Sequence, residues 1–328
     1  MKNVNTTLNN LSDPGIETTQ GTDAAEHRRR SSASSSERRW AAAMLSPAMA
    51  VMGVFVFIPI LLTIWISFHK WTMLTPITSM KWAGFSNYQG LLSNNEFMGA
   101  VRNTVIYVTL AVVIAVPLSF LFGLLLYFPK VAGKGIVRTL LFATYVIPSV
   151  AVALVWGDLY TPQYGAFSRI FEFFGLHSPS FLSSPSSALI SLVILQVWQM
   201  LGYYTVLVIA GLTQIPGQLY EVARVDGVGV IRQAFQITLP LMKRTMVLIL
   251  VLAVVNAVQI FDPVYLLTQG GPINTTNVIS FEIQREAFSY GLAGQASAMA
   301  VSLLIVLMAV GGVGITAVRL RTRQRRAA

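Results

Sequence analysis

The chain has no cysteine and few charged residues. None of its 328 residues is Cys, and Asp, Glu, Lys and Arg together make up 11%, against roughly a quarter in a typical soluble domain. The lack of cysteine excludes disulfides and Cys-based metal sites, and the three histidines, at 27, 69 and 177, form no metal-ligand pattern. A water-soluble protein of this length could not cover its surface with so few charges. The sequence therefore indicates a membrane protein without a metal centre.

Hydrophobic residues, at 54% of the chain, gather into long runs. A helix of about 20 apolar residues crosses the roughly 30 Å hydrocarbon core of a bilayer, and neighbouring helices can re-satisfy the carbonyls that prolines free within it. We therefore expect an all-α membrane protein with one membrane domain at 39–320. The first run is too long for a cleaved signal peptide and is expected to be an anchor. The six expected spans are 44–68, 103–128, 136–157, 188–213, 241–262 and 292–318.

The basic residues are distributed unevenly between the two sides of these spans. Lys and Arg number 23 against 13 Asp and Glu, and 18 of the 23 fall on the side that holds both termini and the 214–240 loop. Because basic residues are enriched on the cytoplasmic side of membrane proteins, this distribution predicts that both termini and the loop are cytoplasmic. No nucleic-acid partner is expected, since the basic residues are dispersed over four segments without interleaved aromatic residues.

The two ends of the chain differ in composition from the spans. Residues 1–38 are rich in Ser, Thr, Asn and charge, and they hold too little apolar surface to fold alone. We expect a disordered cytoplasmic tail there, held to anionic membrane lipid by its arginines, and a second basic cytoplasmic tail at 321–328. The longer loops on the opposite side, 69–102 and 158–187, carry aromatic residues with Gly and Pro, which favours short interfacial helices.

The 214–240 loop is polar and contains glycine, although it lies between two strongly apolar runs. Pro216 suits the first turn of a helix. Leu219, Val222 and Ala223 then follow at the spacing that places them on one apolar face of that helix. The pattern therefore predicts a helix in the first half of the loop.

Charged residues and a glycine complete this loop. Glu221 and Arg224 project from another face of the predicted helix, near enough to pair, and Gly227 permits a turn that a side chain would obstruct. Pro240 marks the entry to the next span. An amphipathic helix lying on the bilayer is an alternative interpretation of the same pattern. The apolar stripe of the second half consists of Ile231, Phe235 and Leu239.

About twenty residues of this loop resemble the cytoplasmic coupling loop of ABC importer permeases. The family pattern is E-A-A-x-x-D-G-A, followed after about nine residues by I-x-L-P. Val222 stands in place of the first alanine, Gln218 in place of a commonly acidic residue and Arg244 in place of a frequent proline. The positions that match are Glu221, Ala223, Asp226, Gly227, Ile237, Leu239 and Pro240.

A second segment, residues 261–272, reads F-D-P-V-Y-L-L-T-Q-G-G-P. It is similar to the end of the fifth span in carbohydrate-type permeases, the maltose and glycerol-3-phosphate group, and its last three residues predict a sharp outward-facing turn. The resemblance covers about residues 40–318 and implies a six-helix permease domain, type I-like, with a coupling helix. The residues that it assigns to ATPase coupling are Glu221, Ala223, Arg224, Asp226, Gly227 and Pro240.

Polar side chains within the expected spans are candidates for a substrate path, because such residues usually face a bundle interior or an aqueous cavity. Amides and aromatic rings suit the hydroxyl groups and ring faces of sugars. Hydrogen bonding between helices is an equally good explanation of each residue. Lys and Arg occur in the spans only within the first four residues, as Arg138, Lys243 and Arg244, which favours a neutral polyhydroxy substrate over a phosphate ester. The candidates are Gln196, Gln199, Tyr203, Asn256, Gln259 and Asp262.

The sequence lacks a P-loop and any constellation of catalytic residues. The only Gly-Lys pair, Gly133-Lys134, is followed by glycine and has Phe128 where the motif needs its first glycine. We therefore expect neither enzymatic activity nor a bound cofactor. The resemblance implies that ATP is bound by a dimer of separate ABC ATPase subunits. It also implies a second permease subunit of related fold, an extracytoplasmic solute-binding protein and a bacterial inner-membrane location.

An ion-gradient-driven secondary transporter is the alternative function. Such transporters place ionisable residues near the middle of their spans, whereas Asp158 and Asp262 lie at the ends of spans in this chain. A membrane enzyme is a weaker alternative, since no paired acid and base or activated nucleophile is present.

Overall fold

The computed structural model describes residues 39–128 and 133–324. The predicted tail 1–38 and the last four residues of the predicted tail 321–328 lie outside the described residues. The chain forms two compact units, Met1–Leu62 and Thr63–Ala328, and each is described by itself. The described residues of the first unit belong to the helix Arg39–Ser67, which contains an 18-residue stretch with a mean hydropathy of 2.5.

A π-turn, η1 (Gly53–Phe57), lies within this first helix and leads into α2 (Ile58–Ser67). Its cause is Pro59, which has no N–H to donate to the carbonyl of Phe55 four residues before it. The hydrogen-bond ladder widens by one residue, so the N–H of Ile58 bonds to the carbonyl five residues back. The helix thus passes the proline without ending.

In the described residues, five helices are long and apolar enough to cross a membrane, each with an 18-residue stretch whose mean hydropathy is between 1.7 and 2.6. All five lie close to runs that the sequence predicts as spans. The fourth comprises α12 (Lys243–Val258) and α13 (Asp262–Leu267), and the fifth begins α15 (Ala293–Gln324). The five helices are Arg39–Ser67, α4 (Asn95–Tyr127), α8 (Ala188–Leu212), Lys243–Leu267 and Ala293–Gly314.

The remaining predicted span, 136–157, is not one continuous helix. α5 (Lys134–Val146) and α6 (Ser149–Leu159) meet at an angle of 101°. The break lies at Pro148, which lacks an N–H and holds the preceding residue in an extended conformation. The expectation of an unbroken helix is therefore wrong here, and the predicted six spans are reached if the bent pair is taken as one.

α8 lies at the centre of the second unit and packs against α4, α5 and α12. Gly202 of α8 faces the backbone of α5, and a Cβ added there would lie only 1.8 Å from the carbonyl oxygen of Leu141. Any side chain at 202 would therefore separate the two helices. The largest residues of the buried core include Tyr107, Leu192, Tyr204 and Ile249.

Short elements connect the long helices on the side predicted to be outside. β1 (His69–Lys70) and β2 (Lys81–Trp82) form an antiparallel pair. The structure has short helices in both long loops, as the sequence predicts: η2 (Ile77–Ser79) and α3 (Ser86–Ser93) in the first and α7 (Ala166–Phe173) in the second. α14 (Ile279–Gln284) and the π-turn η4 (Arg285–Ser289) precede α15.

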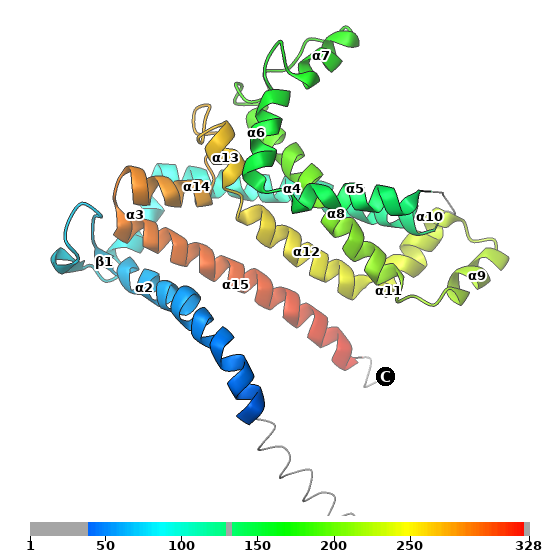
Figure 1. Ribbon diagram of the computed structural model, residues 1–328, viewed down its shortest axis with the longest axis horizontal. Helices are drawn as coiled ribbons and strands as arrows, with labels where there is room; N and C mark the ends of the chain where they lie inside the picture. The colour runs from blue at the N-terminus through cyan, green and yellow to red at the C-terminus, as the bar shows by residue number, and fades with distance from the viewer. Residues whose placement is uncertain (1–38, 129–132, 325–328) are drawn as a thin grey trace, which may run out of the picture. The chain divides into compact units, whose positions relative to one another are not determined.

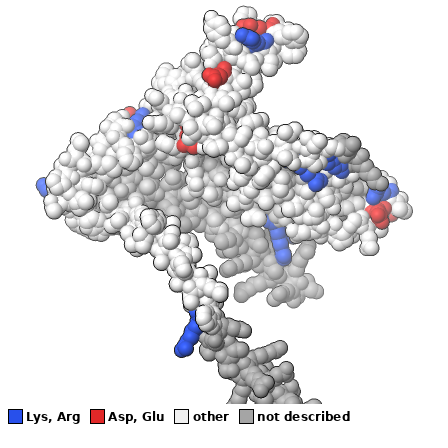
Figure 2. Space-filling view, in the orientation of Figure 1, with Lys and Arg blue, Asp and Glu red and all other residues white. Residues whose placement is uncertain are grey.

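The second unit has two well-separated ends. Figure 1 shows α9 (Gln218–Val225) at one end of the helices α4, α8 and α12, with β1, α3 and α14 at the other end. On the face seen in Figure 2, most of the surface is uncharged, and charged side chains gather around α7 and around α9. Such an arrangement suits a bilayer around the long helices, with aqueous surfaces at their ends.

Candidate functional site

The 214–240 loop folds as two short helical segments joined by a glycine turn. α9 forms the first segment. The second begins with α10 (Val230–Gln233) and continues through the π-turn η3 (Ala234–Thr238) into α11 (Leu239–Leu241). The helical beginning, the turn and the second helical half all lie where the sequence predicts them.

Gly227 ends α9 in a Schellman motif. Its φ is +72°, in the left-handed region that glycine adopts without a steric penalty. The N–H of Gly227 donates to the carbonyl of Arg224 at 3.1 Å, and the N–H of Val228 donates to the carbonyl of Ala223 at 2.9 Å. A Cβ at 227 would meet nothing within 4 Å. The backbone conformation alone therefore requires glycine here.

Pro240 shapes the second half of the loop. It cannot donate to the carbonyl four residues before it, and the π-turn η3 compensates, since the N–H of Leu239 bonds to the carbonyl of Ala234. The same solution occurs at Pro59 in the first helix. The chain consequently enters the next span as helix rather than as irregular loop.

Tyr220 fixes α9 to the membrane domain. Its side chain is buried, its ring stands edge-on to Phe128 at the end of α4 with 4.8 Å between centroids, and its hydroxyl lies 3.1 Å from Oγ1 of Thr238. Burial raises the pKa of the Tyr220 hydroxyl above its ordinary value. Tyr220 therefore connects α9 to both α4 and η3.

The apolar face predicted for α9 is only partly buried. Ala223 is buried, but Leu219 and Val222 are 43% and 61% exposed. The buried face is formed by Tyr220 and Ala223, which also share a helix face at i and i+3. The large ring of Tyr220 occupies the space beside α4, and Leu219 and Val222 consequently lie toward solvent.

The charged side chains of α9 are exposed and do not form the expected ion pair. In the described part of the chain no salt bridge joins Glu221 to Arg224. Arg224 instead donates through Nε to the backbone carbonyl of Tyr220 at 3.3 Å. Asp226 caps the C-terminal end of α9 and is exposed. The outward face of α9 thus presents Glu221, Val222, Val225 and Asp226.

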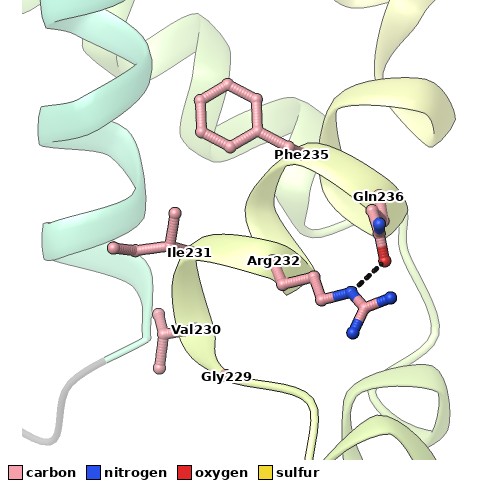
Figure 3. A pocket seen from close by; sticks show the side chains of 6 residues that line it. All are labelled: Gly229, Val230, Ile231, Arg232, Phe235 and Gln236. Carbon is pink, nitrogen blue, oxygen red and sulfur yellow. Dashed lines mark hydrogen bonds between the residues drawn. The ribbon is translucent and has the colours of Figure 1, made fainter.

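A shallow pocket of about 600 Å³ borders the second helical segment. Figure 3 shows Val230 and Ile231 on one side of the turn, with Arg232 and Gln236 on another side, where Nε of Arg232 donates to Oε1 of Gln236 at 2.9 Å. Ile231 and Phe235 of the predicted stripe are 78% and 62% exposed. The lining residues are Gly229, Val230, Ile231, Arg232, Phe235 and Gln236.

Two candidates for the substrate path, Gln196 and Gln199, are buried in α8. Gln199 donates through Nε2 to the carbonyl of Ile147 at 3.4 Å. That carbonyl lies at the break between α5 and α6, where helix hydrogen bonds end. Oγ1 of Thr144 lies 3.3 Å from the carbonyl of Gln199. Gln199 therefore supports the broken span, which is the helix–helix role that the sequence left open.

Tyr203 forms an aromatic platform with Tyr145, which is not among the candidates predicted from the sequence. Its ring stacks on that of Tyr145 from α5, with centroids 4.4 Å apart and an interplanar angle of 12°. Tyr145 is 37% exposed and Tyr203 is half-buried. The sequence gives no signal for this pair, because the two rings are brought together only by the close packing of α5 on α8 at Gly202.

The candidates after α8 lie at the second helix break. Asn256 of α12 donates through Nδ2 to the hydroxyl of Tyr204 at 3.3 Å. Gln259 is exposed and caps α12. Asp262 begins α13 and accepts a hydrogen bond from the hydroxyl of Ser149 at the start of α6. The two broken spans are therefore joined at their breaks.

An ionic cluster at the end of the helices opposite to α9 is a feature that the sequence did not predict. Nη2 of Arg285 lies 2.6 Å from Oε2 of Glu282, which is fully buried, and 3.3 Å from Oε2 of Glu96. Asn277 also donates to Oε2 of Glu282 at 2.8 Å. Glu286 is buried beside this cluster, and its pKa is raised by burial and by the carboxylates of Glu282 and Glu96. Only the i, i+3 spacing of Glu282 and Arg285 is a signal in the sequence.

Comparison with known proteins decides the family. Residues 115–324 match the family described as "Binding-protein-dependent transport system inner membrane component". The trehalose/maltose transport system permease MalF of Thermococcus litoralis is 32% identical over 265 residues, covering 81% of this chain and 88% of that protein. This chain belongs to that family.

Other relatives of this permease have related names. The probable ABC transporter permease YurN of Bacillus subtilis is 31% identical over 274 residues, which is 81% of this chain and 91% of the relative. The sulfoquinovosyl glycerol permease SmoG of Agrobacterium fabrum is 27% identical over 282 residues, 86% and 91% of the two chains. A chain of a bacterial alginate ABC transporter has the same fold, with a TM-score of 0.73, 23% identity, and coverage of 85% and 93%.

These findings confirm the predicted class and fold. The chain is an inner-membrane permease component that works with a binding protein, and its fold is that of the ABC importer permeases. Its relatives are transport subunits and not enzymes. The alternative of a secondary transporter gains no support from any of them.

Proposed function

We propose that this permease forms part of the translocation path for a sugar or related polyhydroxy solute in an ATP-driven importer. Two observations support the solute class. Relatives are named for trehalose and maltose, for sulfoquinovosyl glycerol and for diacetylchitobiose, and the segment 261–272 has the carbohydrate-type form. In the predicted spans, Lys and Arg occur only within the first four residues, as Arg138, Lys243 and Arg244, which disfavours a phosphorylated solute.

In this proposal, a dimer of separate ABC ATPase subunits hydrolyses ATP. The single observation that carries the coupling role is the geometry of α9. Its outward face is exposed while Tyr220 on its inward face is buried against Phe128 and Thr238. ATPase closure would push α9, and Tyr220 would transmit the displacement to α4 and to the span that follows Pro240.

The substrate path is assigned to the break in the third span. The stacked pair Tyr145 and Tyr203 offers an aromatic face to a sugar ring, and Gln199 lies one helical turn away on α8. Aromatic faces and amide groups are the pairing that sugar rings and hydroxyls require. The same proposed path includes Gln196, Asn256, Gln259 and Asp262. Gln199 and Asn256 also form hydrogen bonds to other residues of the chain.

The proposal includes the topology and the remaining partners. Both termini and the 214–240 loop are cytoplasmic, which the basic-residue distribution supports. A second permease of related fold completes the path. A reporter that is active only outside the cytoplasm should give no signal when fused to Ala328 and a strong signal when inserted near Ser178. The opposite pattern would overturn the topology.

Uptake by path variants tests the proposed substrate site. Tyr203→Ala removes half of the aromatic platform while leaving the core helix contacts, and it should lower uptake of a neutral disaccharide with the complex still assembled. Tyr203→Phe keeps the ring and is the matched control. Gln199→Leu and Asn256→Leu should impair uptake as well. Full uptake in Tyr203→Ala and in both Leu variants would remove these residues from the path.

A further inference from the structure

The segment that follows the first membrane helix folds as a small hairpin with a fixed base. The chain enters β1 at His69, just after α2 ends at Ser67. Nδ2 of Asn87, from α3, donates to the carbonyl of Ser67 at 2.8 Å and to that of His69 at 3.0 Å. The N–H of Ala83 donates to the carbonyl of Phe68 at 2.8 Å. The hairpin is therefore anchored at the end of the span.

The loop between the two strands is tied to the start of α15. The N–H of Met73 donates to the carbonyl of Gly291 at 2.8 Å, and the N–H of Gly294 donates to the carbonyl of Trp71 at 3.1 Å. The hairpin is thus held both at its base and along its loop. Its two strands consequently keep their register.

The two charged residues of the hairpin lie opposite each other. Lys70 pairs with Lys81 across the strands, and both are exposed. Opposite residues of an antiparallel pair have Cβ atoms about 4.5–5.5 Å apart, and like charges there destabilise the pair. Residues 68–93 contain no Asp or Glu, and within residues 39–128 and 133–324 no salt bridge includes either lysine. Two positive charges are therefore held together without an acidic partner from this part of the chain.

The same segment exposes aromatic and apolar side chains. Trp82 and Phe85 are 70% and 67% exposed, although both rings contact Phe68, one stacked at 5.9 Å and the other edge-on at 5.4 Å between centroids. In the loop, Leu74 and Ile77 are 90% and 67% exposed. Apolar side chains grouped on a surface mark an interaction site. We call residues 68–85 the lysine hairpin.

We propose that the lysine hairpin binds the headgroup of an anionic phospholipid at the bilayer surface, with the phosphate between Lys70 and Lys81. Its place in the chain supports this occupant, because the hairpin begins where a candidate membrane span ends. Tryptophan rings favour the headgroup level of a bilayer, lysine stems can lie along apolar surface there, and anionic lipid attracts lysines.

A soluble anion fits the hairpin less well than a lipid does. Inorganic phosphate would neutralise the two lysines but would leave Leu74 and Ile77 in water, whereas the headgroup and upper acyl chain of a phospholipid cover both kinds of group. The proposal requires neither the proposed solute nor the proposed topology, since the end of a span lies at a bilayer surface on either side of the membrane.

Spin labelling tests the position of the hairpin in the full-length permease within its assembled complex. Leu74→Cys and Ile77→Cys each introduce the only thiol of the chain. In vesicles of phosphatidylcholine with phosphatidylglycerol, a nitroxide at either position should be accessible to oxygen and protected from a water-soluble nickel chelate. Val225→Cys, on α9, is the aqueous control, since Val225 is 88% exposed. Labels at 74 and 77 that are as open to the chelate as the label at 225 would overturn the inference.

Lipid capture tests the charge of the bound headgroup. A photocrosslinker attached at Leu74→Cys is irradiated in vesicles that contain equal amounts of phosphatidylcholine and phosphatidylglycerol, and the ratio of the two captured lipids is measured. Each lysine near an anionic surface strengthens the attraction about fivefold. Adding Lys70→Gln should therefore lower the ratio of phosphatidylglycerol to phosphatidylcholine about fivefold, and adding Lys81→Gln as well should lower it about 25-fold in total. Equal capture of the two lipids without these substitutions would contradict the proposal.

Two control variants separate the site from general surface charge. Lys70→Arg combined with Lys81→Arg keeps both positive charges and should keep the original ratio. Arg169→Gln removes an exposed charge from α7 and should also leave the ratio unchanged; a fall as large as that of Lys70→Gln would overturn the site. Excess inorganic phosphate should not reduce the capture of phosphatidylglycerol, and full competition would assign the lysines to a soluble anion. Crosslinking to a polypeptide in place of lipid would show that a protein covers the hairpin and would refute the inference.

Discussion

Replacement of Gly227 should disable the coupling loop through its backbone alone. The φ of +72° is unfavourable for any residue with a Cβ, and there is no atom within 4 Å for the new side chain to strike. The perturbation is therefore purely conformational. Gly229, two residues away, is the matched control, because its φ of −65° and ψ of 158° suit valine and its surroundings are equally open.

The free-energy cost of replacing Gly227 follows from its backbone conformation and from the hydrogen bonds of the Schellman motif. A left-handed conformation costs an L residue roughly 1–2 kcal/mol, with valine at the upper end because it is β-branched. If the turn opens instead, the two hydrogen bonds to the carbonyls of Ala223 and Arg224 are lost, at about 0.5–1.5 kcal/mol each. We expect a cost of about 2–3 kcal/mol for Gly227→Val, against less than about 1 kcal/mol for Gly227→Asn.

The assay is retention of the ATPase subunits by permease purified from membranes, together with sugar uptake. A cost of 2–3 kcal/mol lowers the population of the docking conformation, and hence the apparent affinity for the ATPase, by about 30- to 150-fold. Retention and uptake should fall in the order Gly227→Asn, Gly227→Ala, Gly227→Val, with Gly229→Val close to wild type. Wild-type retention in Gly227→Val would refute the reasoning.

Three further results are expected. Glu221→Lys reverses a charge on the exposed face of α9 and should weaken ATPase retention with normal membrane insertion, measured by co-purification; unchanged retention would remove Glu221 from the contact. Tyr220→Ala should uncouple ATP hydrolysis from uptake, while Tyr220→Phe keeps the ring contact with Phe128 and should have a milder effect. Equal uptake per ATP hydrolysed in both variants would contradict the proposal that Tyr220 transmits the displacement of α9. Because the folded-state pKa of Glu286 is raised, its stabilising contribution is present at low pH and lost as pH rises through that pKa. The melting temperature of the wild type should therefore fall more between about pH 5 and about pH 8 than that of Glu286→Gln, and equal slopes would contradict this.

The spans and the glycine turn could be predicted because their causes are local. A span needs only an apolar run of sufficient length, and the turn at Gly227 needs only one residue that accepts a positive φ. The face that α9 buries could not be predicted, because helical spacing allows both Leu219 with Ala223 and Tyr220 with Ala223. The choice depends on the space beside Phe128, which no local pattern reports.

Features that depend on residues far apart in the sequence could not be predicted for the same reason. Pro148 breaks its span by 101°, whereas Pro117 lies within the continuous helix α4, and the sequence around each proline does not distinguish them. The difference depends on which neighbouring groups meet the freed carbonyls, such as the amide of Gln199 at Ile147. The ion pair of Arg285 with Glu96 joins residues 189 positions apart, so only the folded chain reveals it.

We propose that α9 couples ATP hydrolysis by the separate ATPase subunits to uptake of a sugar delivered by the binding protein. The most direct test is uptake of a radiolabelled neutral disaccharide by proteoliposomes that contain the complete complex, with ATP supplied on the side of the 214–240 loop and the binding protein on the other. We predict uptake that requires both components and that persists when proton and sodium gradients are collapsed. Uptake driven by an ion gradient without ATP or binding protein would contradict the account.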